Sequence, residues 1–166
     1  WEKRKNLDNL KVAFIGDGNN VANSWAHGAA KFGINLVFCC PRNYEPDPQV
    51  IESSKKTITG NGSIEFVADP KDAAKNADVI YTDVWYSMGK DDEKEQRRKV
   101  FRPYQVNSEL LKLAKPNCMV MHCLPAHRGE ELTDEVMDGP NSIVIDQAEN
   151  RLHAQKGLLA ALLKGL

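Results

Sequence analysis

The chain has 166 residues, a formal net charge of −1, 42% hydrophobic residues and 27% charged residues. These values favour one globular domain with a real core, and four cysteines without metal-ligand spacing indicate reduced, cytoplasmic thiols. The near-zero charge, the lack of a basic stripe and apolar runs shorter than the ~18 residues of a membrane span argue against nucleic acid or a membrane as partner.

Short apolar runs alternate with helical patterns along the chain. The expected strands are Lys11–Ile15, Asn35–Cys40, Ile64–Val67, Ala77–Thr82, Cys118–Met121 and a short sixth strand, Ser142–Ile145. The expected helices are Val21–Phe32, Asp47–Thr59, Asp69–Asn76, Asp92–Phe101, Ser108–Ala114 and Ala148–Leu163. This alternation predicts βαβ units, and therefore an α/β fold over residues 1–166: a Rossmann-like, doubly wound, mostly parallel sheet of five to six strands with helices on both faces. The segment Tyr86–Val106 is expected to be the least structured and the most mobile.

Polar and reactive residues follow three of the expected strands. The first strand leads into Asp17-Gly18-Asn19-Asn20, the fourth into Asp83 and Ser87-Met88, and the fifth into His122-Cys123-Leu124-Pro125; Arg151 lies near the start of the last helix. Each has a purely structural interpretation, as a helix cap, a buried thiol or an ion pair. Because parallel strands place their carboxyl ends at one edge, where α/β proteins bind ligands, we interpret the set as one site.

The chemistry of these residues favours an amino acid as ligand. A helix that begins near Asn20 offers N–H groups and a positive dipole end to a carboxylate. Asp83 accepts hydrogen bonds only, which suits an ammonium group that Ser87 can share. Carboxylate and ammonium recognised side by side indicate a zwitterion.

A dinucleotide site is the alternative. Gly16-Asp17-Gly18-Asn19-Asn20-Val21 lacks the third glycine of the dinucleotide fingerprint, and the second strand ends without an acid for the ribose. Arg42 could meet a 2′-phosphate, so an NADP-binding Rossmann domain stays open, as does a non-catalytic amino-acid-binding module.

Four segments resemble the ornithine carbamoyltransferase family in order and spacing. They are Phe14–Asn20, Asp83–Gly89, His122–Pro125 and Ala148–Arg151. The resemblance covers the whole chain, but only the C-terminal, ornithine-binding half of the family; the Ser-Thr-Arg-Thr and His-Pro-x-Gln sequences of the carbamoyl phosphate half are not found in these 166 residues. It implies an excised domain that is inactive alone. The complete enzyme, a homotrimer without metal or cofactor, would convert L-ornithine and carbamoyl phosphate to L-citrulline and phosphate.

The resemblance also implies residue roles. Asn20, Asp83, Ser87 and Met88 would hold ornithine, while Cys123, Leu124 and Arg151 would face carbamoyl phosphate. Cys123, with Asp83 beside it, would orient the δ-amine or take its proton, and Arg151 would stabilise the developing negative charge. The ring of His122 is expected to point away from Cys123, and Tyr86–Val106 to act as a lid.

Overall fold

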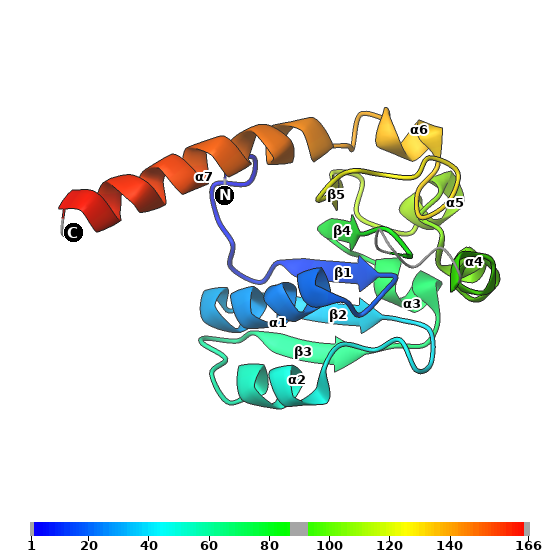
Figure 1. Cartoon of the computed structure of the whole chain (residues 1–166), viewed down its shortest axis with the longest axis horizontal. Helices are drawn as coiled ribbons and strands as arrows, with labels where there is room; N and C mark the ends of the chain where they lie inside the picture. Colours follow the sequence, from blue (N-terminus) through cyan, green and yellow to red (C-terminus); the bar gives the residue numbers. More distant parts are fainter. Residues whose placement is uncertain (1, 87–92, 165–166) are drawn as a thin grey trace.

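A computed structural model describes residues 2–86 and 93–164 of the chain. Its centre is a five-stranded sheet in the order β3-β2-β1-β4-β5, with every neighbouring pair parallel (Figure 1). The strands are β1 Lys11–Ile15, β2 Asn35–Cys39, β3 Ser63–Phe66, β4 Val79–Thr82 and β5 Met119–His122. Because all the strands run the same way, the loops that follow them lie at one edge of the sheet.

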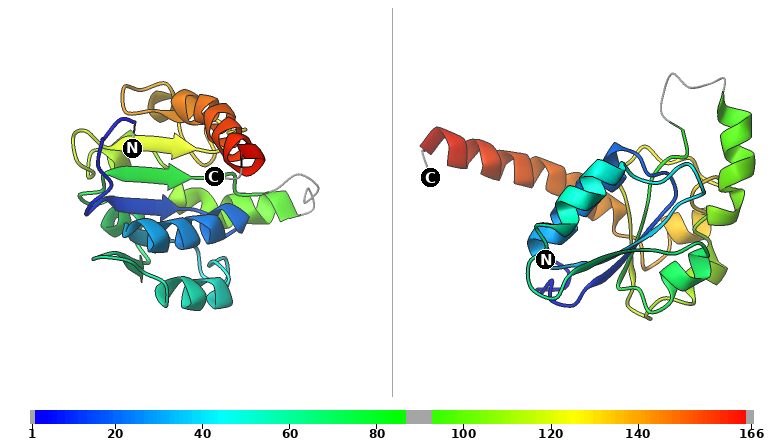
Figure 2. Two further views of the ribbon diagram at one scale, coloured as in Figure 1. Left: turned by 90° about the vertical axis from the view of Figure 1, so that its left-hand side faces the viewer. Right: turned by 90° about the horizontal axis from the view of Figure 1, so that it is seen from below.

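Helices cover both faces of the sheet, as predicted. The helices are α1 Asn20–Phe32, α2 Pro48–Lys55, α3 Pro70–Ala74, α4 Lys94–Phe101, α5 Ser108–Leu111, α6 Asp134–Met137 and α7 Val144–Lys164. One apolar core lies between the sheet and α1 with α2, and a second lies between the sheet and α3, α5 and α6 (Figure 2). Alternation of side chains along each strand supplies both cores, because successive residues point to opposite faces.

Local signals set the ends of α1. Asn19 adopts an extended conformation, and its Oδ1 accepts hydrogen bonds from the backbone N–H groups of Val21 and Ala22, at 2.9 and 3.2 Å. Gly33 ends the helix with φ 66°, a conformation that favours glycine. Between these caps, fully buried alanines, Ala26 among them, allow the helix to lie close to the sheet.

The sixth predicted strand, Ser142–Ile145, is wrong. Ser142 makes a single bridge to Val120 of β5, and α7 begins at Val144, four residues before its predicted start. A short apolar run fits a strand or a buried helical turn equally well, so its pattern could not separate the two. The fifth strand is also displaced by one residue: His122 is its last member, paired with Thr82.

The helix predicted over Asp92–Phe101 is confirmed as α4, and the expectation that Tyr86–Val106 is the least structured segment is wrong for its described second half. α4 and a 3₁₀ turn, Arg102–Tyr104, occupy its second half, and α6 was not predicted at all. Within α4 Arg97 is buried: its Nη2 lies 2.7 Å from Asp17 Oδ2, and its Nε donates to the Trp85 carbonyl at 2.6 Å. This anchored helix therefore ties the loop after β1 to the loop after β4.

α7 begins against β5 and then extends away from the rest of the domain (Figures 1 and 2). Its outer turns expose large apolar side chains, Leu152, Leu158, Leu159, Leu162 and Leu163. An exposed apolar patch of this kind marks a surface that another protein or domain can cover. Among the helices of the described residues, none has the length and apolar character needed to cross a membrane.

The close approach of α1 to the sheet gives a stability prediction. Ala26→Leu should lower the free energy of unfolding by about 1–3 kcal/mol, because Ala26 is fully buried between helix and sheet and a larger side chain overpacks its site. Lys31→Leu, on the exposed side of the same helix, should change it by less than about 0.5 kcal/mol. Urea denaturation of both variants measures the difference, and equal effects would contradict this account of the packing.

Candidate functional site

The carboxylate of Asp83 connects the loops that follow β1, β4 and β5. Asp83 is buried directly after β4; its Oδ2 accepts from Asn19 Nδ2 at 2.7 Å, and its Oδ1 accepts from the Cys123 thiol at 2.9 Å and from the Val84 N–H at 2.8 Å. Three segments far apart in the sequence therefore meet at one carboxylate, as their placement after parallel strands predicts.

Cys123 is a protonated thiol in this arrangement. Burial, followed by the hydrogen bond to the Asp83 carboxylate and its charge, raises the pKa of Cys123 to about 12. A thiol donates this hydrogen bond and a thiolate cannot, so deprotonation would place two negative charges in contact. At neutral pH Cys123 therefore acts as a hydrogen-bond donor to Asp83.

The ring of His122 is buried, and the expected separation of the ring from Cys123 is not observed, because one ring nitrogen lies within 4.8 Å of the Cys123 sulfur and of an Asp83 carboxylate oxygen. Its Nε2 lies 3.1 Å from Glu131 Oε1, and its Nδ1 accepts from the Leu124 N–H at 2.8 Å. Both His122 and Glu131 are fully buried. Leu124 has a left-handed φ of 58°, and the Leu124–Pro125 peptide bond is cis.

The first turns of α7 complete the site. Gln147 donates to the Tyr81 hydroxyl at 3.1 Å and accepts from the His122 N–H at 3.0 Å, so it fixes α7 to β4 and β5. Arg151, one turn further along the helix, is exposed. It lines a cavity of about 710 Å³ together with Cys123 and Leu124. The three residues expected to face one substrate therefore border the same space.

The structure adds one residue to the predicted amino-acid site. Asn19 contacts Asp83, whereas the Asn20 side chain, expected to hold the ligand, is exposed and makes no hydrogen bond to any described residue. The N–H groups of Val21 and Ala22 are already bonded to Asn19, so the start of α1 offers an anion fewer donors than the sequence indicated. Ser87 and Met88 lie outside the described residues.

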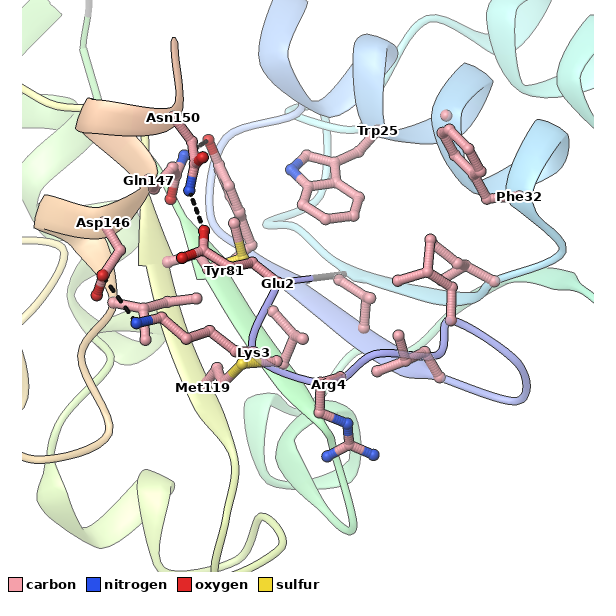
Figure 3. A pocket seen from close by; sticks show the side chains of 18 of the residues that line it. Glu2, Lys3, Arg4, Trp25, Phe32, Tyr81, Met119, Asp146, Gln147 and Asn150 are labelled. Atoms are coloured by element: carbon pink, nitrogen blue, oxygen red, sulfur yellow. Dashed lines mark hydrogen bonds and ion pairs between the residues drawn. The ribbon is translucent and has the colours of Figure 1, made fainter. Parts of the chain in front are cut away.

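A second cavity, of about 550 Å³, lies elsewhere, between α1, α7 and residues 2–10 (Figure 3). Trp25 and Phe32 approach it from α1 and Met119 from β5, while the pairs Lys3–Asp146 and Glu2–Asn150 connect its rim. Its lining is mainly apolar, and it does not include Asp83, Cys123 or Arg151. We therefore place the candidate chemistry at the strand ends.

Two groups of side chains in the described part of the chain are close enough to share a metal ion. They are Asp83, His122 and Cys123, and His127, Glu130 and Glu131. In the first group both ring nitrogens of His122 are engaged, and the pKa of the Cys123 thiol is raised by burial. Metal binding there would have to break existing hydrogen bonds and remove a proton.

Sequence reasoning missed Arg97, Glu131 and Gln147. Each reaches the site loops through a hydrogen bond to a residue distant in sequence. Only the pairing of strands and helices in three dimensions brings such partners together, so no local pattern identifies them. A charged residue inside an otherwise polar helix, such as Arg97, looks like an exposed one.

The comparisons with known proteins agree over almost the whole chain. Residues 8–162 match the family model described as aspartate/ornithine carbamoyltransferase, Asp/Orn binding domain. An ornithine carbamoyltransferase of Pyrococcus abyssi is 56% identical over 167 residues, which cover 100% of this chain and 53% of the relative. An ornithine carbamoyltransferase of Archaeoglobus fulgidus is 56% identical over 163 residues, which cover 98% of this chain and 52% of the relative. The chain spans about half the length of the curated relatives it matches.

Solved structures give the same result. The ornithine carbamoyltransferase from Pyrococcus furiosus superposes with a TM-score of 0.94 at 55% identity, over 100% of this chain and 53% of that one. The ornithine transcarbamoylase from Giardia lamblia superposes with a TM-score of 0.88 at 36% identity, over 96% of this chain and 52% of that one.

The contact between Cys123 and Asp83 predicts the reactivity of the thiol. Asp83→Asn removes the negative charge that opposes thiolate formation, so alkylation of Cys123 by iodoacetamide at pH 8.5 should become about tenfold faster. Mass spectrometry of the alkylated chain measures the rate at each cysteine.

Cys40 is the internal control. Its pKa is raised by burial and by neighbours other than Asp83, so its rate should not change between the two proteins. An unchanged or slower reaction of Cys123 in Asp83→Asn would show that the carboxylate does not govern the thiol.

Proposed function

The chain belongs to the aspartate/ornithine carbamoyltransferase family, and from this membership we propose that residues 1–166 are the ornithine-binding domain of an ornithine carbamoyltransferase. The complete enzyme would transfer the carbamoyl group of carbamoyl phosphate to the δ-amine of L-ornithine, giving L-citrulline and phosphate. The observation that carries the proposal is the Asp83 carboxylate, which is held between Asn19 and Cys123, because Cys123 lines the same cavity as Arg151.

In the proposed reaction the neutral δ-amine attacks the carbonyl carbon of carbamoyl phosphate. A C–N bond forms, the bond from that carbon to the phosphate oxygen breaks, the amine loses a proton, and phosphate leaves. The negative charge of Asp83 suits an ammonium group of ornithine. Ser87 and Met88 are proposed to share the ornithine, and Asn20 to contact it from the start of α1.

The proton balance constrains the role of Cys123. With a pKa raised by burial to about 12, its thiol cannot be the base that first receives a proton at neutral pH. We therefore assign Cys123 to orientation: its thiol holds the Asp83 carboxylate, and its sulfur lies where the δ-amine would approach. Asp83 is the acceptor that remains within reach of that amine.

Arg151 and the backbone at Cys123 and Leu124 supply the second half of the site. A guanidinium bordering the cavity can stabilise negative charge on the carbamoyl phosphate oxygens as the tetrahedral centre forms. Backbone carbonyls at a strand end can accept hydrogen bonds from the carbamoyl NH₂ group. The gain is positioning and electrostatic stabilisation, without a covalent intermediate.

The NADP-binding alternative has less support than the amino-acid site. A Cβ on Gly18 would lie 2.2 Å from the backbone at Glu45 and Pro46, and the Gly18 N–H donates to the Tyr44 carbonyl at 2.8 Å. Gly18 is therefore needed for close approach of the protein's own chain, whereas the dinucleotide fingerprint uses this glycine for approach of the pyrophosphate. A non-catalytic binding module is the other alternative, and turnover distinguishes it.

We further propose that the complete enzyme is a cytoplasmic homotrimer in which a carbamoyl phosphate domain accompanies this one. The exposed leucines of α7 support a neighbouring domain, because an apolar helix surface of this kind is stabilised when it is covered.

Citrulline formation tests the function. This chain joined to a carbamoyl phosphate domain should form citrulline from ornithine and carbamoyl phosphate, whereas the 166-residue chain alone should not, because half of the proposed site is missing from it. Turnover by the chain alone at even a thousandth of a typical ~10 s⁻¹ would contradict the two-domain proposal. Absence of turnover in the joined protein would favour a binding module.

The role of Asp83 gives a second test. In the joined protein Asp83→Asn should weaken ornithine binding by about 1.5–3 kcal/mol, since it removes one charge from a charge-assisted hydrogen bond, and should leave carbamoyl phosphate binding nearly unchanged. Calorimetric titration with each substrate measures the two affinities. Asp72→Asn, an exposed carboxylate on α3, is the matched control and should change neither. Equal weakening of both substrates would remove Asp83 from the ornithine site.

A further inference from the structure

We propose that His122 is a positioning residue, whose ring holds the backbone of Cys123 and Leu124 in the geometry that the carbamoyl phosphate site requires. Glu131 fixes the ring by holding its other nitrogen. This inference rests on the proposed function for its kinetic consequences, but its structural core can be tested separately.

Hydrogen bonding commits both ring nitrogens. The Leu124 N–H can only donate, so Nδ1, 2.8 Å away, must present a lone pair and carries no proton. The ring proton is therefore on Nε2, which donates to Glu131 Oε1 at 3.1 Å. The same carboxylate oxygen accepts from the His127 N–H at 2.6 Å, so Glu131 is itself fixed by the chain that follows the site.

Burial makes this arrangement rigid. His122 is 1% exposed and Glu131 is fully buried, so neither group can exchange its partner for water without leaving a buried polar atom unpaired. The backbone N–H of His122 is bonded as well, to Gln147 of α7. The residue that ends β5 is therefore held at three atoms before the chain enters the site.

The conformation held by the ring is one that leucine rarely adopts. Leu124 has φ 58°, in the left-handed region, where a non-glycine residue is disfavoured. The hydrogen bond from its N–H to His122 Nδ1 compensates for this cost, and the dihedral angles of Cys123 and Leu124 decide where their carbonyl oxygens point. The ring thus controls the proposed acceptors without touching substrate.

The geometry does not support a proton relay through His122. Cys123 Sγ donates to Asp83, and the two ring nitrogens are paired with Leu124 and Glu131. One ring nitrogen lies within 4.8 Å of the Cys123 sulfur, but both nitrogens already have other partners, so the influence of the ring on the reaction passes through the backbone. The two nitrogens can therefore be tested one at a time.

Two substitutions of His122 each replace the hydrogen bond of one ring nitrogen and remove that of the other. In His122→Asn the side-chain oxygen can accept from the N–H two residues ahead, as in an Asx-turn, so it replaces Nδ1 but does not reach Glu131. In His122→Gln the longer amide can donate to Glu131, so it replaces Nε2 but leaves the Leu124 N–H without its acceptor.

The enzyme assay compares these variants in the joined protein. His122→Gln should lower kcat/KM for carbamoyl phosphate by about 100-fold, the order expected for a small displacement of positioning groups, and change the KM for ornithine by less than about threefold. His122→Asn should lose less than about tenfold. Asp78→Asn is the control for a buried polar change at the opposite edge of the sheet, where Asp78 holds Arg4 and Lys115; it should lower stability and leave both constants unchanged.

The hydrogen bonds that hold the His122 ring between Leu124 and Glu131 form a clamp on the end of β5. Nitrogen NMR of the 166-residue chain tests this clamp independently of activity. In the wild type the Nδ1 resonance of His122 should be that of an unprotonated nitrogen and the Nε2 resonance that of an N–H, as the hydrogen bonds of the ring require. A proton on Nδ1, or equal kinetic losses in His122→Asn and His122→Gln, would overturn the proposal. If the joined protein has no turnover while the NMR result holds, the proposed function fails and the clamp stands.

Discussion

Parallel pairing of β1, β4 and β5 is the constraint on which the rest of the molecule depends. Phe14 pairs with Tyr81, and Thr82 pairs with His122, so the three strands end at nearly the same level. The Thr82 hydroxyl donates to the Ile15 carbonyl at 2.7 Å and fixes that level between β1 and β4. Asp83 and Cys123 are the next residues of their chains, and this register alone brings them within a hydrogen bond. A slip of one residue in either strand would turn that strand's side chain to the other face and separate the pair.

Features governed by neighbouring residues could be predicted from the sequence. The cap of α2 is an example: Asp47 accepts from the Gln49 N–H at 2.8 Å and Pro48 occupies the first turn, as expected, although the helix ends at Lys55 rather than Thr59. The parallel direction of the strands, the two-sided packing and the placement of Asp83 and Cys123 at one edge also follow from the βαβ pattern, whereas the strand order was not predicted. Where the pattern was ambiguous the prediction failed, as at Ser142–Ile145, because three apolar residues in a row do not distinguish a strand from the first turn of a helix.

Contacts made by buried polar side chains could not be predicted. Arg97, Gln147 and Glu131 fix the loops after β1 and β4, the start of α7 and the end of β5, and each is bonded to an atom distant in sequence. Burying such groups costs solvation energy that only well-placed partners offset. Near the strand ends these buried groups hold the loops that carry the site residues, which apolar side chains could not do by hydrogen bonding. Asp78, at the other edge, uses the same chemistry to hold Arg4, Lys11 and Lys115, which are structural.

The site has a rigid half and an open half, and the division follows from burial. Asp83, His122 and Glu131 are buried and have fixed partners, whereas Arg151 is exposed on the helix that extends away from the sheet. An exposed guanidinium is surrounded by water, which weakens its attraction for a phosphate. The same group acts more strongly once a neighbouring surface excludes that water. The exposed leucines of α7 lie on the same helix. A domain that covered these leucines would bury apolar surface and would also exclude water from the proposed carbamoyl phosphate site. The same contact would therefore stabilise the association of the domains and strengthen the electrostatic effect of Arg151.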